Sequence, residues 1–204
     1  GGIETIPAVS DIDGSPDAAF IALPRTATPG VIGELRALGC GGAVIYAAGF
    51  AESGDHALQQ ALLAAAAGMP LLGPNCYGFI NAASRVALWP DEHGLSALDR
   101  GVAIVTQSGN IGCNLTMLQR GLPLAALLTL GNQADVDIAE AVEALALDPR
   151  ITAIGVHIEG LRDVAVFARA AAVAREHAQI AREAAQGARW TAREAQGAAD
   201  KAMR

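Results

Sequence analysis

Short apolar runs alternate along this chain with stretches that carry apolar residues at helical spacing. The first half holds three such runs, Ala19–Leu23, Ala43–Tyr46 and Pro70–Leu72, and a helix is predicted in each interval. Strands separated by helices indicate βαβ units, in which the strands lie parallel within one sheet. The alternation therefore favours an α/β protein and argues against all-helical and all-β folds.

Proline and glycine mark where the predicted helices begin and end. Pro29 stands at the start of the first helix, and Gly39 follows its last periodic residue. Proline suits a first helical turn and glycine suits the position after a last one. The second helix is predicted from about Gly54 to Ala67.

The same rhythm returns after an irregular stretch at Asn81–Arg100. Strands are predicted over Val102–Thr106, Leu124–Leu130 and Ile151–Ile158, and helices over Asn110–Arg120, Asp137–Leu147 and from Arg162 onward. The aspartates of the loop GNQADVD are expected to cap the second of these helices. We predict two parallel-sheet units that meet within residues 82–100.

The composition excludes several classes of protein. Of 204 residues, 52% are hydrophobic and 17% are charged, unlike a disordered chain. The net charge is −7 with no basic cluster before the C-terminal tail, so nucleic acid is not expected as a partner. No uncharged run reaches the length of a membrane span, and no membrane partner is expected. Three scattered cysteines without a CxxC pair indicate reduced thiols and a cytoplasmic location.

The segment Val105–Gly112 (VTQSGNIG) joins a strand end, a polar turn and a helix start. The first N–H groups of a helix have no partner within it, so those of Gly109, Asn110 and Ile111 are predicted to be free beside the Ser108 hydroxyl. Such groups bind phosphate through hydrogen bonds and the helix dipole. Equally, Ser108 could simply cap its helix.

Other loops are predicted to leave their strands at the same sheet edge. In Leu72–Asn81 (LGPNCYGFIN), Asn75 and Cys76 would project at the carboxyl end of a strand, where open α/β sheets bind ligands. The alternative is a connecting turn with a buried cysteine. The loop that starts at Tyr46 (YAAGFAE) runs toward that edge, and Glu159 follows the last strand. A carboxylate there could orient an imidazole, bind a cation or begin a helix.

Together and in this order, the motifs resemble the NDP-forming acyl-CoA synthetases, relatives of the succinyl-CoA synthetase α subunit. The matching segments are IALP, AVIYAAGFAESG, GPNCYGFIN, VTQSGNIG, LGNQADVD and IGVHIEG, which span roughly residues 17–175. The resemblance implies an α/β fold with a Rossmann-like CoA-binding domain, incomplete at its N-terminus, over residues 1–99. A partial flavodoxin-like parallel-sheet domain would follow over 100–176, with a helical tail of uncertain origin over 177–204.

The resemblance also implies a reaction and its ligands. In these enzymes a carboxylic acid becomes an acyl phosphate, a phosphohistidine carries phosphate to and from an ATP-grasp domain, and CoA thiolysis releases the acyl-CoA. The expected ligands are CoA, a carboxylic acid and ATP or ADP, with Mg²⁺ only on an ATP-grasp domain or subunit. No metal site is expected in this chain itself, and a homo-oligomer is left open.

Site residues are carried over onto matching positions. Ser108, Gly109 and Asn110 match the helix start that receives the phosphohistidine, and Glu159 matches the catalytic glutamate that holds it. The positions that match the CoA site are Pro24, Gly49, Phe50, Glu52, Asn75 and Cys76.

The chain departs from the family pattern in three places. It begins after the glycine-rich turn that grips CoA, it lacks an SHTG-like phosphohistidine loop beyond residue 176, and it carries no ATP-grasp domain. None of its histidines, His56, His93, His157 and His177, lies in such a motif. We therefore expect that this chain is truncated and does not complete the reaction alone.

The tail from about His177 is rich in Ala, Arg, Glu, Gln and Gly, and Ile180 is almost its only large aliphatic residue. We predict that it is not the family's native continuation and arises from a frameshift, a truncation or a misread sequence. The alternative is a genuine surface helix.

Other functions fit the residues less well. A non-catalytic CoA-binding or regulatory module of a larger protein is favoured by the missing histidine. A thiol or serine hydrolase would use Cys76 or Ser108, but Ser108 lacks the G-x-S-x-G elbow. A NAD-binding protein would need a G-x-G-x-x-G after a strand, which the sequence does not contain.

Overall fold

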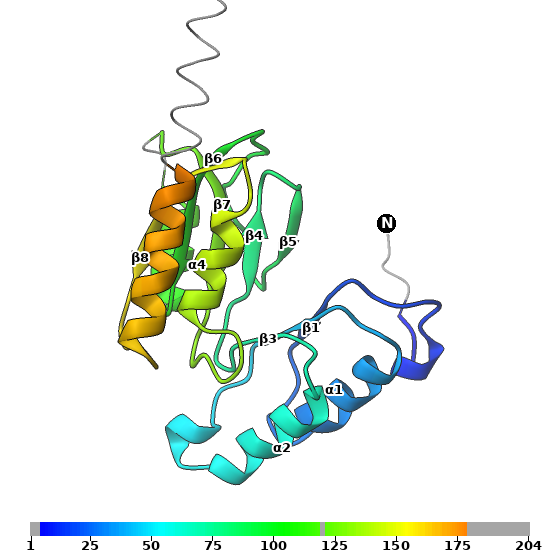
Figure 1. Cartoon of the computed structure of the whole chain (residues 1–204). Coiled ribbons are helices and arrows are strands. Elements are labelled where there is room, and N and C mark those ends of the chain that lie inside the picture. The colour runs from blue at the N-terminus through cyan, green and yellow to red at the C-terminus, as the bar shows by residue number, and fades with distance from the viewer. Residues whose placement is uncertain (1–4, 119–120, 179–204) are drawn as a thin grey trace, which may run out of the picture.

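The computed structural model describes residues 5–118 and 121–178. These residues form a three-stranded sheet and a five-stranded sheet with helices packed beside them. Figure 1 shows the first sheet with α1 and α2 in the lower part of the molecule and the second sheet above it. The prediction for the tail lies outside the described residues from position 179 onward and stays a prediction.

The first sheet is parallel and follows the predicted alternation. Its strands are β1 (Ala19–Ile21), β2 (Ala43–Ile45) and β3 (Leu71–Leu72), in the order β1-β2-β3. The connecting helices are α1 (Thr28–Ala37) and α2 (His56–Ala66). This arrangement confirms the βαβ units expected from the sequence.

The core of this unit lies between the sheet and the two helices. Ile32 and Leu35 of α1 and Leu62 of α2 pack against Ile45 and Phe50, and all five side chains are buried. Burial of side chains of this size stabilises a fold by roughly 1.5–3 kcal/mol each.

The second sheet has the order β5-β4-β7-β6-β8 and is mixed. Strands β6 (Gly101–Thr106), β7 (Leu124–Thr129) and β8 (Ile151–His157) are parallel, as predicted. Strands β4 (Phe79–Asn81) and β5 (Val86–Leu88) form an antiparallel hairpin on β7. The expectation of an all-parallel second sheet is therefore wrong, because β4, which ends where the irregular stretch begins, and β5, which lies within that stretch, join the sheet as an antiparallel hairpin.

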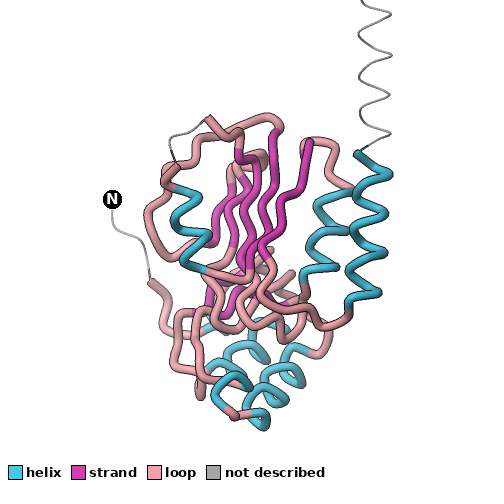
Figure 2. Tube along the Cα trace, turned by 90° about the vertical axis from the view of Figure 1, so that its left-hand side faces the viewer, coloured by secondary structure: helices cyan, strands magenta, loops and turns pink. Residues whose placement is uncertain are grey.

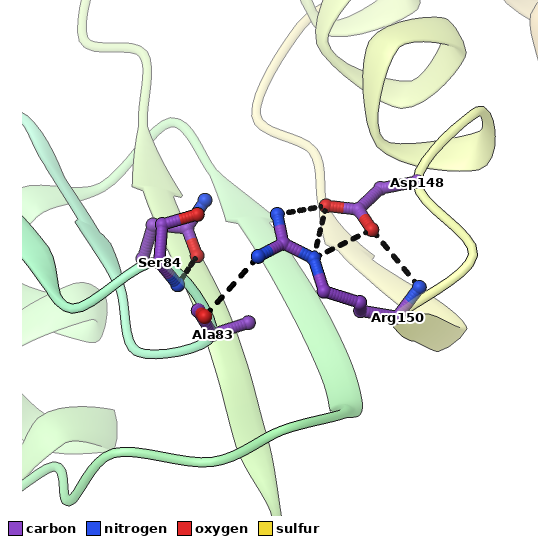
Figure 3. Close-up of polar contacts among 5 residues, drawn as sticks. Ala83, Ser84, Asp148 and Arg150 are labelled. Carbon is purple, nitrogen blue, oxygen red and sulfur yellow. Dashed lines mark hydrogen bonds and ion pairs between the residues drawn. The ribbon is translucent and has the colours of Figure 1, made fainter.

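The turn between β4 and β5 is held by one hydrogen bond within the turn and by another from Arg150. The Ser84 N–H donates to the Asn81 side chain at 2.9 Å, and the Arg150 guanidinium donates to the Ala83 carbonyl at 3.1 Å (Figure 3). Asp148 in turn accepts from Arg150 at 2.6 Å, and this hydrogen bond holds the pKa of the Asp148 carboxyl below its usual range. These contacts tie β4–β5 to the start of β8, although the predicted domain boundary at residue 99 assigns the hairpin to the first unit.

Helices cover both faces of the second sheet. Figure 2 shows α3 (Gly109–Thr116) on one face and α4 (Ile138–Ala146) with the helix at 164–178 on the other. Asp137 caps α4 by accepting from the N–H groups of Ala139 and Glu140, as expected from GNQADVD. None of the described helices combines the length and apolar character needed to cross a bilayer.

Candidate functional site

The two sheets are joined by hydrogen bonds that β3 and the loop after it make with the loop after β7. The Leu71 N–H donates to the Asp135 carboxylate at 2.8 Å, and three backbone hydrogen bonds run beside it. These are Asn132 N–H to Pro74 O at 2.9 Å, Ala134 N–H to Gly73 O at 2.8 Å and Val136 N–H to Leu71 O at 3.2 Å. One aspartate of GNQADVD therefore joins the two units and does not cap the helix.

Glu52 organises the loop after β2. Its carboxylate accepts hydrogen bonds from the N–H groups of Gly49 and Phe50, which lie at the tip of that loop. Partial burial raises the pKa of Glu52, but the N–H groups of Gly49, Glu52 and Phe50 and the Asn132 side chain together outweigh it and lower that pKa. Glu52 is thus an anion that acts on its own loop, and Phe50 in that loop is fully buried.

Pro24 lies near the loop after β2 because the next residue, Arg25, bonds to that loop. The Arg25 guanidinium donates to the Gly49 carbonyl and lies 3.8 Å from the Asp55 carboxylate. The Pro24 carbonyl accepts from the Thr28 hydroxyl at 3.3 Å at the start of α1. The structure thus brings together four of the residues predicted for the CoA site, namely Pro24, Gly49, Phe50 and Glu52.

Asn75 and Cys76 follow the carboxyl end of β3, and their side chains lie in different environments. Asn75 has φ +56° and an exposed side chain, and its N–H donates to the Ala47 carbonyl at 2.9 Å. Cys76 is only 1% exposed, and its thiol donates to the Thr129 carbonyl at 2.9 Å. The expectation that both residues project at the edge therefore holds for Asn75 and is wrong for Cys76.

Burial also changes the chemistry of Cys76. It raises the pKa of the thiol to about 11, although hydrogen bonds with Thr129 and Gly78 act in the opposite direction. Because the nucleophile in cysteine chemistry is the thiolate, a buried thiol that stays protonated at neutral pH is inert. Cys76 is not the nucleophile of a thiol hydrolase.

The start of α3 presents free backbone donors. Ser108 accepts from the Ile111 N–H at 3.4 Å, so the prediction that this N–H is free is wrong and Ser108 does cap the helix. The N–H groups of Gly109 and Asn110 have no acceptor within residues 5–118 and 121–178. The Nδ1 of the nearby His157 ring lies 3.2 Å from the Thr106 hydroxyl, and within the described residues no hydrogen bond joins this ring to Ser108.

Gln107 positions the loop that carries Glu159. Its side chain is 6% exposed, accepts from the N–H groups of Glu159 at 2.6 Å and Gly160 at 2.8 Å, and donates to the Gly160 carbonyl. Since β8 ends at His157, Glu159 lies in this loop with an exposed side chain. The sequence reasoning missed Gln107, although it stands directly before Ser108 in the QSG motif.

A cavity of about 360 Å³ opens between the loop after β2 and the loop after β3. It is lined by Tyr46, Ala47, Ala48, Asn75 and Tyr77. The Tyr77 ring also packs on Gly109 so closely that a Cβ there would overlap it, which places the cavity beside the start of α3. Of the predicted site residues, Asn75 lines the cavity, and neither tyrosine was identified from the sequence.

The described residues contain no group of three or more His, Cys, Asp or Glu side chains that could hold a metal ion. The chemistry of the site as described therefore depends on backbone N–H groups, amides, one loop carboxylate and aromatic rings.

Two family models match the chain in the order of its two sheets. Residues 1–82 match the CoA binding domain, and residues 99–200 match the succinyl-CoA ligase like flavodoxin domain. The chain belongs to the NDP-forming acyl-CoA synthetase family. Its α/β fold, with a Rossmann-like unit followed by a flavodoxin-like unit, is that of the ADP-forming synthetases.

Curated relatives of this synthetase chain are longer than the chain itself. A trans-feruloyl-CoA synthase, FCS1, from an unknown prokaryotic organism is 33% identical over 179 residues, which cover 83% of this chain and 25% of that protein. The α subunit of ADP-forming acetate–CoA ligase II from Pyrococcus furiosus is 29% identical over 177 residues, covering 83% and 38% respectively. The chain thus spans between 25% and 38% of the length of these two relatives.

Solved structures of similar proteins share the fold. The crystal structure of PH0766 from Pyrococcus horikoshii superimposes with a TM-score of 0.77 at 30% identity, covering 83% of this chain and 40% of that one. A dinucleotide forming acetyl-coenzyme A synthetase 1 from Ca. Korarchaeum cryptofilum, in complex with phosphate and ADP, gives 0.76 at 28% identity, covering 85% and 38%.

Proposed function

We propose that this chain forms the CoA-binding and phosphate-receiving part of an NDP-forming acyl-CoA synthetase. The overall reaction would join a carboxylic acid to the CoA thiol while ATP is converted to ADP and phosphate. One observation carries the proposal: the loop ordered by Glu52 and the exposed Asn75 line one cavity, and Tyr77 of that cavity contacts Gly109, which carries a free N–H group at the start of α3. A thiol and an acyl phosphate must meet at such a point to react.

Each group has a distinct role in this proposal. Glu52 accepts hydrogen bonds from the N–H groups of Gly49 and Phe50 and so holds the loop after β2 in the conformation that contacts CoA. The N–H groups of Gly109 and Asn110 bind the phosphoryl group, with the helix dipole favouring its negative charge. Glu159, positioned by Gln107, orients the histidine that carries the phosphate.

The nucleotide and Mg²⁺ are proposed to bind on an ATP-grasp domain or subunit. We place the reaction in the cytoplasm because Cys40, Cys76 and Cys113 are all free thiols. The relatives are named for acids as different as ferulate and acetate, so family membership leaves the acid open.

Calorimetric titration of the chain with CoA tests the proposal. Wild type is expected to bind, and Glu52→Gln is expected to bind about tenfold more weakly, because a neutral amide loses charge-assisted hydrogen bonds to two N–H groups. Glu143→Gln, an exposed glutamate on α4, is the matched control and should bind CoA like wild type. A folded wild-type chain that does not bind CoA would overturn the proposed function.

A further inference from the structure

The cavity at the junction is small and partly aromatic. Its volume is about 360 Å³, near the lower end of the range of roughly 300–1,000 Å³ in which small ligands bind. Tyr46 and Tyr77 line it together with the small residues Ala47 and Ala48 and the polar Asn75. A cavity of this size accommodates one ring with a short side chain and is too small for a complete CoA molecule.

The two tyrosines belong to a continuous row of rings. The centroids of Phe20 and Tyr46 lie 5.8 Å apart, those of Tyr46 and Tyr77 5.5 Å apart, and those of Tyr77 and Trp89 5.6 Å apart. Aromatic residues make up only 4% of the sequence, and four of them form this row within the described part of the chain. Tyr46 remains 40% exposed at one end of the cavity, where a flat ligand could cover its ring.

Two glycines of α3 let the row approach the proposed phosphate site. A Cβ at Gly109 would overlap the Tyr77 ring, and one at Gly112 would lie 3.1 Å from the Trp89 ring. The Tyr77 ring therefore both lines the cavity and contacts the first residue of α3, so the cavity lies next to the free N–H groups.

This position has a chemical consequence that rests on the proposed function. The acyl carbon is bonded first to a phosphate oxygen and then to the CoA sulfur, so the acyl group must lie next to the phosphate site. The space against Tyr46 and Tyr77 satisfies that requirement. We propose that these two rings form the acyl pocket and that its substrate is an aromatic carboxylic acid with a short side chain.

Two acids that differ only in the ring test the substrate class. Hydrocinnamate carries a benzene ring on propanoate, and cyclohexanepropanoate carries a saturated ring of similar size. Stacking against an aromatic wall favours the benzene ring, so hydrocinnamate is expected to bind about fivefold tighter in calorimetric titrations. Acetate, which cannot cover the rings, should bind at least tenfold more weakly than hydrocinnamate.

Variants locate the binding site. Tyr46→Leu and Tyr77→Leu are expected to remove the preference for hydrocinnamate, whereas Tyr46→Phe and Tyr77→Phe should retain it because the rings remain. Phe167→Leu, which packs beside α4, is the control and should behave like wild type. Tyr46 is partly exposed, so its Leu variant keeps the test valid even if Tyr77→Leu fails to fold.

A CoA titration of the same samples separates the two proposals. If CoA binds but both ring acids bind equally, or if Tyr46→Leu leaves the preference unchanged, the aromatic pocket is overturned and the proposed function stands. Displacement of hydrocinnamate by CoA in strict competition would place CoA in the cavity and also overturn the pocket. If CoA does not bind at all, the proposed function is overturned, and the aromatic pocket, which rests on it, is overturned with it.

Discussion

Gln107 and Gly160 exchange hydrogen bonds in both directions: the Gln107 amide donates to the Gly160 carbonyl and accepts from the Gly160 N–H at 2.8 Å. A single buried side chain thereby replaces water for both polar groups of a loop residue. The pairing also fixes Glu159, the neighbour of Gly160, next to the start of α3.

Gln107→Glu is expected to destabilise the chain by about 1–3 kcal/mol, because a carboxylate cannot donate to the Gly160 carbonyl and would be buried beside it. Gln133→Glu is the matched control: Gln133 is also buried, but among residues 5–118 and 121–178 its side chain bonds only through its oxygen, which accepts from the Ile138 N–H at 2.9 Å. A carboxylate keeps that bond at the start of α4. Urea unfolding of both variants measures the difference, and equal losses would contradict the role given to Gln107.

Cys76 should make stability depend on alkaline pH. Its thiol holds its proton to about pH 11 in the folded chain, whereas an unfolded chain releases it near the ordinary pKa of 9. Below that value the group favours folding fully, and its contribution is lost as pH rises from 9 to about 11. The free energy of unfolding of wild type should therefore fall more steeply than that of Cys76→Ala, by up to about 1.4 kcal/mol per pH unit. Parallel curves for the two proteins would exclude the effect.

Asp135 is expected to stabilise the contact between the two sheets by accepting a hydrogen bond. The Leu71 N–H that it binds belongs to a residue that is 1% exposed, so Asp135→Ala would leave a buried donor without a partner. A loss of about 1–3 kcal/mol in unfolding free energy is expected. Asp135→Asn keeps an oxygen at the same place and should lose much less. Similar losses in both variants would show that charge, not the hydrogen bond, matters there.

Phosphate titration followed by backbone amide NMR should identify the donors at the start of α3. The Gly109 and Asn110 resonances are expected to shift, and the Ile111 resonance should shift less because Ser108 occupies its N–H. Ser108→Ala should weaken phosphate binding by about 1 kcal/mol. If no amide in this turn responds to phosphate, Ser108 serves only as a helix cap.

The parallel strands of both sheets could be predicted because each is an apolar run bounded by helical periodicity. β6 and β7 are largely buried, and their sequences are correspondingly apolar. The β4–β5 hairpin could not be predicted in this way. Its strands have three residues each, two residues of β5 are exposed, and its place in the sheet depends on β7, which follows much later in the chain.

The candidate site was predictable only where a motif is local. Ser108, Gly109 and Asn110 form one turn, so their sequence already indicates what they offer a ligand. The contacts of Gln107 with Gly160 and of Cys76 with Thr129 each join residues more than fifty positions apart. The sequence pattern does not indicate which distant residues pair. The hydrogen bonds of Gln107 with the Glu159 loop and the burial of Cys76 are therefore seen only in the folded structure.

The strand order has a consequence for how this protein is made. Because β1, β2 and β3 occupy the first sheet in chain order, that sheet can close as soon as Leu72 has left the ribosome. β4 cannot pair fully until β7 has been synthesised, because β7 is its neighbour on the inner side of the sheet and β6 comes between them in the sequence. Until Thr129 emerges, the nascent hairpin exposes an unpaired edge to neighbouring polypeptides. Its very short strands limit what such an edge can capture during translation.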